Sequence, residues 1–429
     1  MPTQFCLFAE SKIFDLIFVI PLSFAFQNRQ VPNHFTPVSG KDRIEELDIF
    51  RGFAIFGIFM VNILVMAVSF VYREEWVEEQ TGLIQDIPRF ILENFFFGKF
   101  YLIFSFLFGL GVAMQIAKSK ESGQYSNRFF LRRFFSLFLF GIVHILFLWS
   151  GDILHIYGAL GFSLLLFFRL RPKVIFWSAM LIFLFPLYSE VFQLVVNEWI
   201  GFDHMVPLAE YSRIELADLK HNGTYLSGIS IRLKEYAYLA EYVYAGMIPA
   251  ALTMMLLGGY FVKRKLLWSL HDWVFRYRFT VPVLALFSLG YKLILMYYVR
   301  PNFEIEFGSP LSIVLMTIFY FADIVISIGY LWLIVFLLRR EFWQKMFSPL
   351  AYVGRMALTN YILQSVCGYW IMRTLNGYDF LTIAACVVIV IAVYICQIFF
   401  SKAWLSRFKF GPLEWFWRCL SYGKILPFR

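Results

Sequence analysis

Charged residues are scarce in this sequence of 429 residues. Lys, Arg, Asp and Glu together make up 16% of it, whereas hydrophobic residues make up 60% and aromatic residues 21%. Soluble domains carry about a quarter charged residues, so this composition excludes an ordinary water-soluble protein and leaves apolar surface that must face lipid. The apolar runs are long and unbroken, unlike the alternating strands of a membrane β-barrel. The composition therefore predicts an all-α, polytopic integral membrane protein.

Signatures of soluble enzymes and of metal sites are also missing. The sequence contains no P-loop, HExxH, CxxC or GxSxG pattern. Its few cysteines include no close pair, which excludes a disulfide framework or a thiolate metal site; they stand at positions 6, 367, 386, 396 and 419. The net charge of +9 comes from basic residues spread between the apolar runs. We therefore expect neither a metal nor a nucleic-acid partner.

Ten apolar segments are long enough to cross a bilayer. A helix needs about 20 apolar residues for this, or about 17 where its flanking side chains reach the interface. The ten segments are 49–70, 100–116, 129–149, 153–168, 174–195, 242–262, 279–298, 312–337, 356–372 and 381–401. Together they predict a ten-helix transmembrane domain over residues 43–401.

The distribution of Lys and Arg predicts which side of the membrane each loop faces. The loops 118–133, 169–173, 263–278 and 339–345 and the tail 402–429 hold 22 Lys and Arg. The alternate loops 71–100, 196–240, 299–311 and 373–380 hold 9, together with 15 Asp and Glu. Because Lys and Arg resist translocation, we expect both termini to be cytoplasmic.

Three regions are not part of the spans. Residues 1–42 contain an apolar stretch too short to cross the membrane, and they predict an interfacial or poorly ordered N-terminal extension, with a signal peptide as the alternative. The outer loops 71–99 and 196–241 are long and aromatic, so they form either caps over an outward cavity or amphipathic helices lying on the bilayer. The tail 402–429 contains an interfacial helix that begins at Pro412.

Ionisable side chains inside the spans are the main functional signal, because lipid disfavours each of them by about 2.5–3.5 kcal/mol. His144 lies 11 residues beyond Arg133, about 16 Å of helix, and so near the middle of the membrane. A tight outer turn follows, and the returning segment would bring Tyr157, and His155 with it, opposite His144. His144 is therefore a candidate general base or transient acyl acceptor, with a neutral histidine hydrogen-bonded between helices as the structural alternative.

The same outer turn supplies further candidates. Asp152 stands at the mouth of the hairpin, where it would either assist His144 in catalysis or cap the next helix. We assign Trp149 and Tyr157, which flank it, to substrate binding.

The first span contains candidates for binding a donor molecule. Asp48 and Arg51 stand three residues apart at its cytoplasmic edge, and Asn62 follows 11 residues after Arg51, at the depth of His144. This arrangement suits a ligand whose anionic end stays cytosolic while its reactive end reaches inward. A juxtamembrane ion pair is the structural alternative for Asp48 and Arg51.

Two further pairs lie in later spans. Lys292 and Asp323 stand at depths that allow them to pair, either as a structural ion pair or as part of a path for protons or cations. Asn360 and Gln364 share one helix face, which predicts interhelical hydrogen bonds.

Six blocks of this sequence resemble the YeiB-like family of bacterial multi-pass inner-membrane proteins, which contain a domain of unknown function (DUF418). The order and spacing agree from about residue 43 to residue 424. The blocks are 47–53 (LDIFRGF), 99–100 with 107–109, 144 with 149–154 (WSGDIL) and 157–158, 254–258 (MMLLG), 354–361 (GRMALTNY) and 411–415 (GPLEW).

The D-x-x-R-G element at 48–52 is also remotely similar to transmembrane acyltransferases of the heparan-glucosaminide N-acetyltransferase type. This resemblance implies a donor, acyl-CoA or acetyl-CoA, bound at Asp48 and Arg51, with a histidine at the chemical centre. It assigns no role to His155. The function it implies is transfer of an acyl group from cytosolic acyl-CoA to an extracytoplasmic hydroxyl or amine on a small molecule or glycan. The alternative is a small-solute or proton-coupled transporter, and in either case membrane lipids and a homo-oligomer are possible partners.

Overall fold

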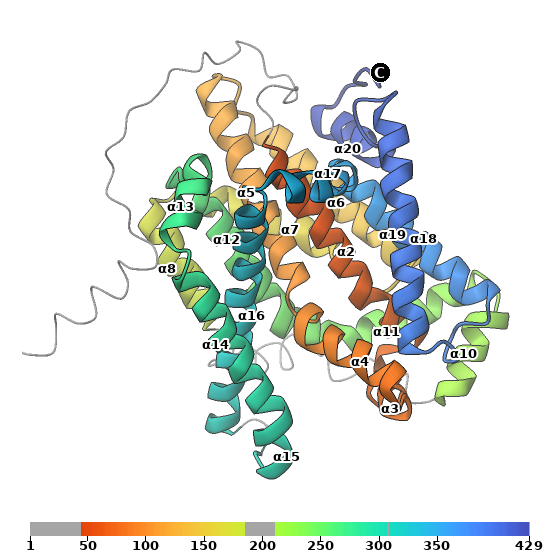
Figure 1. The fold of residues 1–429 in the computed structure, drawn as a ribbon. Coiled ribbons are helices and arrows are strands. Elements are labelled where there is room, and N and C mark those ends of the chain that lie inside the picture. Colours follow the sequence, from red (N-terminus) through yellow and green to blue (C-terminus); the bar gives the residue numbers. More distant parts are fainter. Residues whose placement is uncertain (1–43, 185–210, 307–308, 429) are drawn as a thin grey trace, which may run out of the picture. The chain divides into compact units, whose positions relative to one another are not determined.

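The computed structural model describes residues 44–184, 211–306 and 309–428, and every regular element in these ranges is a helix (Figure 1). Among the described residues, six helical stretches are long and apolar enough to cross a membrane, at 45–67, 83–121, 127–147, 280–302, 310–337 and 383–405. Three shorter apolar helices occupy 154–167, 172–183 and 248–263. The prediction of an all-helical membrane protein is therefore confirmed, while the number of ten spans and the side of the termini stay predictions. The extension 1–42 lies outside the described residues.

The helices have the following bounds in chain order: α2 Glu45–Ala67, α3 Arg73–Glu79, α4 Leu83–Ile91, α5 Phe100–Glu121, α6 Asn127–Phe147, α7 Leu154–Phe167, α8 Pro172–Phe183, α10 Arg213–Asn222, α11 Ser227–Glu241, α12 Ile248–Lys263, α13 Leu270–Arg276, α14 Thr280–Ile294, α15 Arg300–Asn302, α16 Pro310–Leu337, α17 Glu341–Arg355, α18 Ala357–Thr374, α19 Ile383–Leu405 and α20 Pro412–Tyr422. Each predicted span coincides with one of these helices where it is described. The second half of the fifth span lies outside the described residues.

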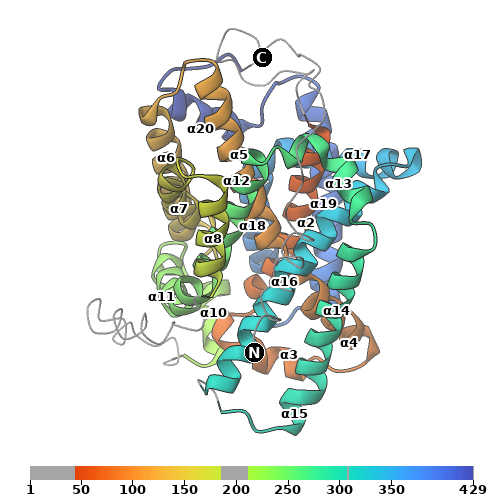
Figure 2. The same cartoon turned by 90° about the vertical axis from the view of Figure 1, so that its left-hand side faces the viewer.

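The helices α6 and α7 form a hairpin whose close packing depends on glycine. A Cβ atom at Gly141 would lie 2.1 Å from the backbone nitrogen of His155, and one at Gly158 would lie 2.4 Å from that of Phe138. Contacts this short are possible only without a side chain, so the two backbones lie directly against each other, as Figure 2 shows. The hairpin thereby fixes the turn at 148–153, which contains the site residues.

The helix α18 begins where α17 ends, and a residue of the tail caps it. Met356 leaves the helical conformation between the two. The buried carboxylate of Glu414 in α20 accepts hydrogen bonds from the backbone N–H groups of Leu358, at 2.7 Å, and Thr359, at 3.0 Å. Burial raises the pKa of Glu414, and these hydrogen bonds oppose that rise. The tail helix therefore holds the start of α18 in addition to lying at the predicted interface.

The two outer loops differ from each other. In the first, α4 exposes the apolar side chains of Leu83, Ile84 and Ile87, which is typical of an amphipathic helix on a bilayer surface. In the second, α10 and α11 line a pocket described below. The described residues thus fit the bilayer-surface interpretation for the first loop and the cap interpretation for the second.

Candidate active site

His144 lies in the last turn of α6, nearer the predicted outer end of the helix than the midpoint expected from its spacing. Its side chain is buried between α6, α7 and α18. The Nε2 atom lies 2.8 Å from the hydroxyl oxygen of Ser365, and the Nδ1 atom lies 2.9 Å from Oδ1 of Asp152. The second contact is an electrostatic one, because the N–H is not aligned with the oxygen for a linear hydrogen bond. Tyr361 of α18 packs its ring beside the imidazole, with the ring centroids 5.3 Å apart.

Asp152 is the centre of the cluster. Its Oδ2 atom accepts hydrogen bonds from both the backbone N–H and Nδ1 of His155, each at 2.8 Å. Burial disfavours the charged carboxylate, but the contacts from His144 and His155 outweigh it, so the pKa of Asp152 lies well below its ordinary value. Asp152 therefore caps the first turn of α7, as one interpretation predicted, and it also lies against two imidazole rings. Its role in catalysis stays a prediction.

The carboxylate of Asp152 favours the same tautomer in both histidines. Because each ring turns Nδ1 toward a carboxylate, Nδ1 carries the proton and Nε2 is left as an acceptor. His144 then accepts the hydroxyl proton of Ser365, and His155 accepts that of Tyr236, at 2.9 Å. Burial raises the pKa of Tyr236, so this hydroxyl keeps its proton. Tyr236 is in turn 3.0 Å from the hydroxyl of the exposed Tyr244, so hydrogen bonds connect the buried cluster with the surface.

A pocket of about 50 Å³ adjoins the cluster, which is enough for a few water molecules or a small polar group. Its walls come from α2, α10, α11, α18 and the turn after α6. Ser365 and Trp149 both line it, so Trp149 is placed where a substrate-binding residue was predicted. The pocket is also lined by the charged side chains of Lys220, Arg232, Arg373 and Glu235.

The side chain of Tyr157 does not lie opposite His144, where the sequence predicted it. Its hydroxyl group bonds to the hydroxyl of Ser105, at 2.6 Å, and donates to the carbonyl of Tyr101, at 3.0 Å, both on α5. Residues two positions apart on a helix point about 200° apart, so His155 faces Asp152 and Tyr157 faces away from it. The structure therefore brings His155 to the site in place of Tyr157, which is buried and does not line the pocket.

Asp48 and Arg51, two of the residues predicted to bind the donor, lie at the start of α2, whereas the end of this helix lines the pocket. Arg51 donates a hydrogen bond to Asp48 at 2.8 Å, so the juxtamembrane ion pair is present. The guanidinium of Arg133 on α6 lies over the ring of Trp417, 3.7 Å from its centroid, and interacts electrostatically with Arg51. Asn62 is half-buried. Helix geometry places it about one turn from Val65, which lines the pocket.

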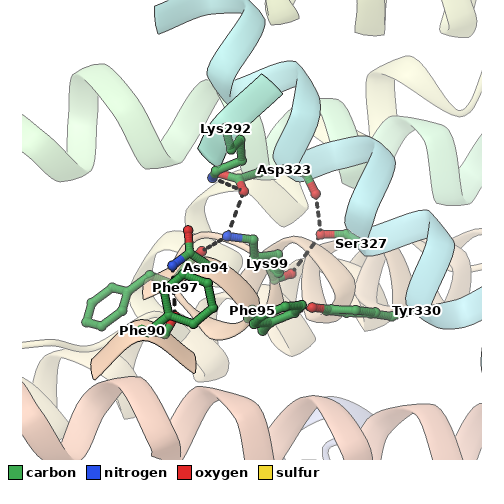
Figure 3. Close-up of polar contacts among 9 residues, drawn as sticks. All are labelled: Phe90, Asn94, Phe95, Phe97, Lys99, Lys292, Asp323, Ser327 and Tyr330. Atoms are coloured by element: carbon green, nitrogen blue, oxygen red, sulfur yellow. Dashed lines mark hydrogen bonds and ion pairs between the residues drawn. The ribbon is translucent and has the colours of Figure 1, made fainter. Parts of the chain in front are cut away.

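The prediction that Lys292 pairs with Asp323 is confirmed, and a third residue joins the pair (Figure 3). Lys99 lies 3.0 Å from Oδ1 of Asp323 and donates a hydrogen bond to the carbonyl of Phe97 at 2.7 Å. The relative exposures of Lys99, Lys292 and Asp323 are 0%, 2% and 4%. A Cβ at Gly98, whose φ is +81°, would lie 2.7 Å from Oδ2 of Asp323, so glycine is needed where this loop meets α16.

The interhelical hydrogen bonds predicted for the ninth span are confirmed. Asn360 donates to the hydroxyl of Ser401 at 2.9 Å, and Gln364 donates to the side chain of Gln397 at 2.9 Å. These contacts fix the rotation of α18 against α19. They thereby turn the neighbouring Ser365 toward His144 on the other side of the helix.

Three site residues were not identified from the sequence, namely Ser365, Tyr236 and Arg232, and His155 was expected opposite His144 without a role of its own. Serine is common in membrane helices, and Ser365 meets a histidine that is 221 positions away. His155 stood in the predicted hairpin, and its spacing of three from Asp152 was the signal that could have identified it. Tyr236 and Arg232 lie in an outer loop whose fold the sequence pattern left open.

Comparison with known proteins gives relatives along almost the whole chain. Residues 261–424 match the family described as "Protein of unknown function (DUF418)". An "Uncharacterized 39.9 kDa protein in amylase 3'region" of Bacillus acidopullulyticus is 28% identical over 394 residues, covering 91% of this chain and 97% of its own. YxaH of Bacillus subtilis is 29% identical over 416 residues (90% and 96%), and YeiB of Escherichia coli is 26% identical over 420 residues (89% and 96%).

Proposed function

We propose that this chain, which belongs to the YeiB-like family of DUF418 membrane proteins, is a membrane acyltransferase. It moves an acyl group, such as acetyl, from cytosolic acyl-CoA to a hydroxyl or amine acceptor on the extracytoplasmic side of a bacterial inner membrane. One observation carries the proposal: Ser365, His144 and Asp152 form a hydroxyl–imidazole–carboxylate series in which the hydroxyl lines a pocket.

This series has the arrangement used by nucleophilic serine enzymes. A buried carboxylate holds Nδ1–H of an imidazole, and Nε2 accepts the proton of a serine hydroxyl. In the proposed reaction, Ser365 attacks the thioester carbonyl while His144 removes its proton. His144 then returns the proton to the CoA thiolate, which leaves as the thiol. In the second half, the acceptor attacks the acyl-serine, its proton passes to His144 and back to Ser365, and the serine is regenerated.

The donor would approach from the predicted cytoplasmic end of α2 and α6. Arg51 and Arg133 lie there, and Nε of Arg133 has no hydrogen-bond acceptor among the described residues. Guanidinium groups bind phosphates through paired hydrogen bonds, so these residues suit the nucleotide end of CoA. The distance from Arg133 to His144 along α6 is about 16 Å, which the extended arm of CoA would have to cover. Asn62 lies along this route on α2.

The orientation in the membrane is a part of the proposal that can be tested separately. A reporter fused after Ser150 is expected on the extracytoplasmic side, and one fused after Lys265 in the cytoplasm, because of the Lys and Arg distribution. The reverse result would turn the pocket toward the cytosol and contradict the direction of transfer.

The experiment that tests the proposal measures release of CoA from radiolabelled acetyl-CoA by the purified chain in lipid nanodiscs. His144→Ala and Ser365→Ala are expected to lower this rate by about 10²–10⁴-fold. Two matched controls should keep it: His271→Ala, whose ring lies 3.4 Å from Glu46, and Ser163→Ala, whose hydroxyl only bonds its own helix. Equal rates in all four variants would contradict the proposal.

A transport function is the second candidate, and the cluster of Lys99, Asp323 and Lys292 favours it. Buried ionisable groups between membrane helices are typical of proton and ion paths. Substrate-dependent proton uptake into vesicles that is lost in Lys99→Met, together with no consumption of acetyl-CoA, would favour this candidate over acyl transfer.

A further inference from the structure

The pocket beside Ser365 has an excess of positive charge. Three cationic side chains line it, Lys220 of α10, Arg232 of α11 and Arg373 of α18, against one carboxylate, Glu235 of α11. Glu235 is already engaged, because it forms an ion pair with Lys220 and accepts a hydrogen bond from Ser150 at 3.1 Å. Lys220 and Glu235 therefore neutralise each other, and two guanidinium charges are left over.

Neither guanidinium has an acidic partner within 4 Å in the described part of the chain. Arg373 donates to the hydroxyl of Tyr369 at 3.0 Å and to the carbonyl of Gly223 at 2.7 Å, which are both neutral. Arg232 donates from Nε to the carbonyl of Leu146 at 2.8 Å. These contacts with neutral groups hold both side chains in place and do not neutralise their charge.

The second terminal nitrogen of Arg232 is the most informative atom in the pocket. Arg232 has a relative exposure of 7%, and its Nη2 atom is buried without any hydrogen-bond acceptor among the described residues. Leaving a buried, charged donor without an acceptor is unfavourable, so such an atom in a pocket wall indicates a ligand that supplies one. A phosphate or a carboxylate supplies two oxygens in the geometry that a guanidinium prefers.

We propose that the acyl acceptor is a hydroxyl-bearing molecule with an anionic group, a phosphate or a carboxylate, which Arg232 and Arg373 hold while the hydroxyl faces Ser365. This inference rests on the proposed function only in naming the ligand as the acceptor. The pocket volume fits the anionic group itself, and Trp149 and Tyr369 offer flat walls to the atoms beside it. Thr224, which is exposed, lies on the outer wall where the rest of the molecule would extend.

The test compares three small probes that share a three-carbon skeleton: glycerol 3-phosphate, glycerate and neutral glycerol. Binding to the full chain in phosphatidylcholine nanodiscs is measured by calorimetric titration, without any acyl donor. One or both anions should bind, and glycerol should bind at least tenfold more weakly. Arg232→Gln, and separately Arg373→Gln, should raise the Kd of the anion at least tenfold. Lys234→Gln is the matched control, because it removes the same charge from α11 outside the pocket and should leave the Kd unchanged.

The lipid of the nanodiscs distinguishes two sources of the anionic group, a lipid headgroup and a soluble acceptor. If the headgroup of an anionic lipid fills the pocket, nanodiscs of phosphatidylglycerol should abolish binding of the soluble anion to the wild-type chain, whereas a soluble acceptor predicts the same Kd in both lipids. Thermal unfolding of each variant verifies that it is folded. Two results would overturn the inference: equal binding of glycerol and the anions, or anion binding that both arginine variants and the control keep alike.

Binding and turnover distinguish this inference from the proposed function. If the chain binds anions through Arg232 but never consumes acetyl-CoA, the anion-binding pocket is supported and the acyltransferase function is contradicted. If acetyl transfer to glycerol is as fast as to glycerol 3-phosphate, the acyltransferase function is supported and the proposal of an anionic acceptor is contradicted.

Discussion

Two clusters of buried ionisable side chains lie between the helices of this protein, and they differ in what surrounds them. In the first, His144 and His155 share Asp152, and hydrogen bonds lead from there to Ser365 in the pocket wall and through Tyr236 to the exposed Tyr244.

In the second, Lys99 and Lys292 share Asp323, and further hydrogen bonds go to backbone carbonyls and to Ser327. None of these three residues lines the pocket beside Ser365.

Burial of charge does not by itself indicate a reaction site. Both carboxylates are almost completely buried, and each lies within 3.0 Å of two nitrogen-bearing side chains. Only the first cluster adjoins the pocket, through Ser365. We therefore assign chemistry to the cluster of Asp152 and helix–helix cohesion to the cluster of Asp323.

The largest effect on activity is expected for Asp152→Asn. The amide keeps the shape but cannot hold Nδ1–H of His144 as an anion does, so the ring loses its orientation and tautomer. In a hydroxyl–imidazole–carboxylate series of another enzyme, this change costs about 10⁴-fold in rate, and we expect a loss of that order in acetyl-CoA turnover. A variant that turns over at the wild-type rate would remove Asp152 from the chemistry.

The largest effect on stability is expected for Asp323→Asn. Two buried lysines lose the carboxylate they share, and leaving a buried charge unpaired costs about 3–5 kcal/mol. The midpoint of thermal unfolding in nanodiscs should fall accordingly. Asp86→Asn is the control, because Asp86 pairs with Arg89 at the surface and should change stability by about 0.5 kcal/mol or less. If Asp323→Asn unfolded like the wild type but lost function, the second cluster would be a functional site as well.

A smaller effect on both properties is expected for Gly141→Ala. The new Cβ would lie 2.5 Å from Oδ2 of Asp152 as well as against His155, so the hairpin must open. Overpacking of this kind costs about 1–3 kcal/mol, and a displacement of about 1 Å at the site costs about 10²-fold in turnover. Gly290→Ala is the matched control in α14, where a Cβ meets no atom within 4 Å. Equal behaviour of the two variants would show that the hairpin does not fix the site.

The smallest effect is a dependence of stability on pH. The pKa of Asp152 is lowered in the folded chain, so its stabilising contribution is present above the unfolded pKa of about 3.9 and is lost as the pH falls below it. The difference in unfolding temperature between the wild type and Asp152→Asn should be constant from pH 5 to 8 and should shrink below about pH 4. A difference that shrinks already between pH 7 and 5 would mean that Asp152 titrates at higher pH and is not held by the two imidazoles.

The sequence predicted those features that depend on residues close together in the chain. The helical spans follow from runs of apolar residues. His144 and Asp152 come together because only eight positions separate them at the tip of the hairpin. Lys292 and Asp323 were paired because both needed a partner in lipid.

The remaining features depend on how the helices rotate and pack. The sequence pattern of an apolar membrane segment determines this only weakly. Their hydrophobic residues lie on all sides, so no amphipathic face shows which side turns inward. This is why Tyr157 was expected at the site together with His155, and why Ser365 was not identified. Lys99 precedes a long apolar run, and nothing in this local pattern shows that its partner is on α16.

In the proposed reaction, Ser365 carries the acyl group between donor and acceptor. Mass spectrometry of the chain after brief incubation with isotopically labelled acetyl-CoA and rapid quenching in acid tests this role. We expect a labelled acetyl group on Ser365 that is missing in Ser365→Ala and His144→Ala and present in Ser163→Ala. A label on a residue outside the cluster, or turnover that continues in Ser365→Ala, would contradict it.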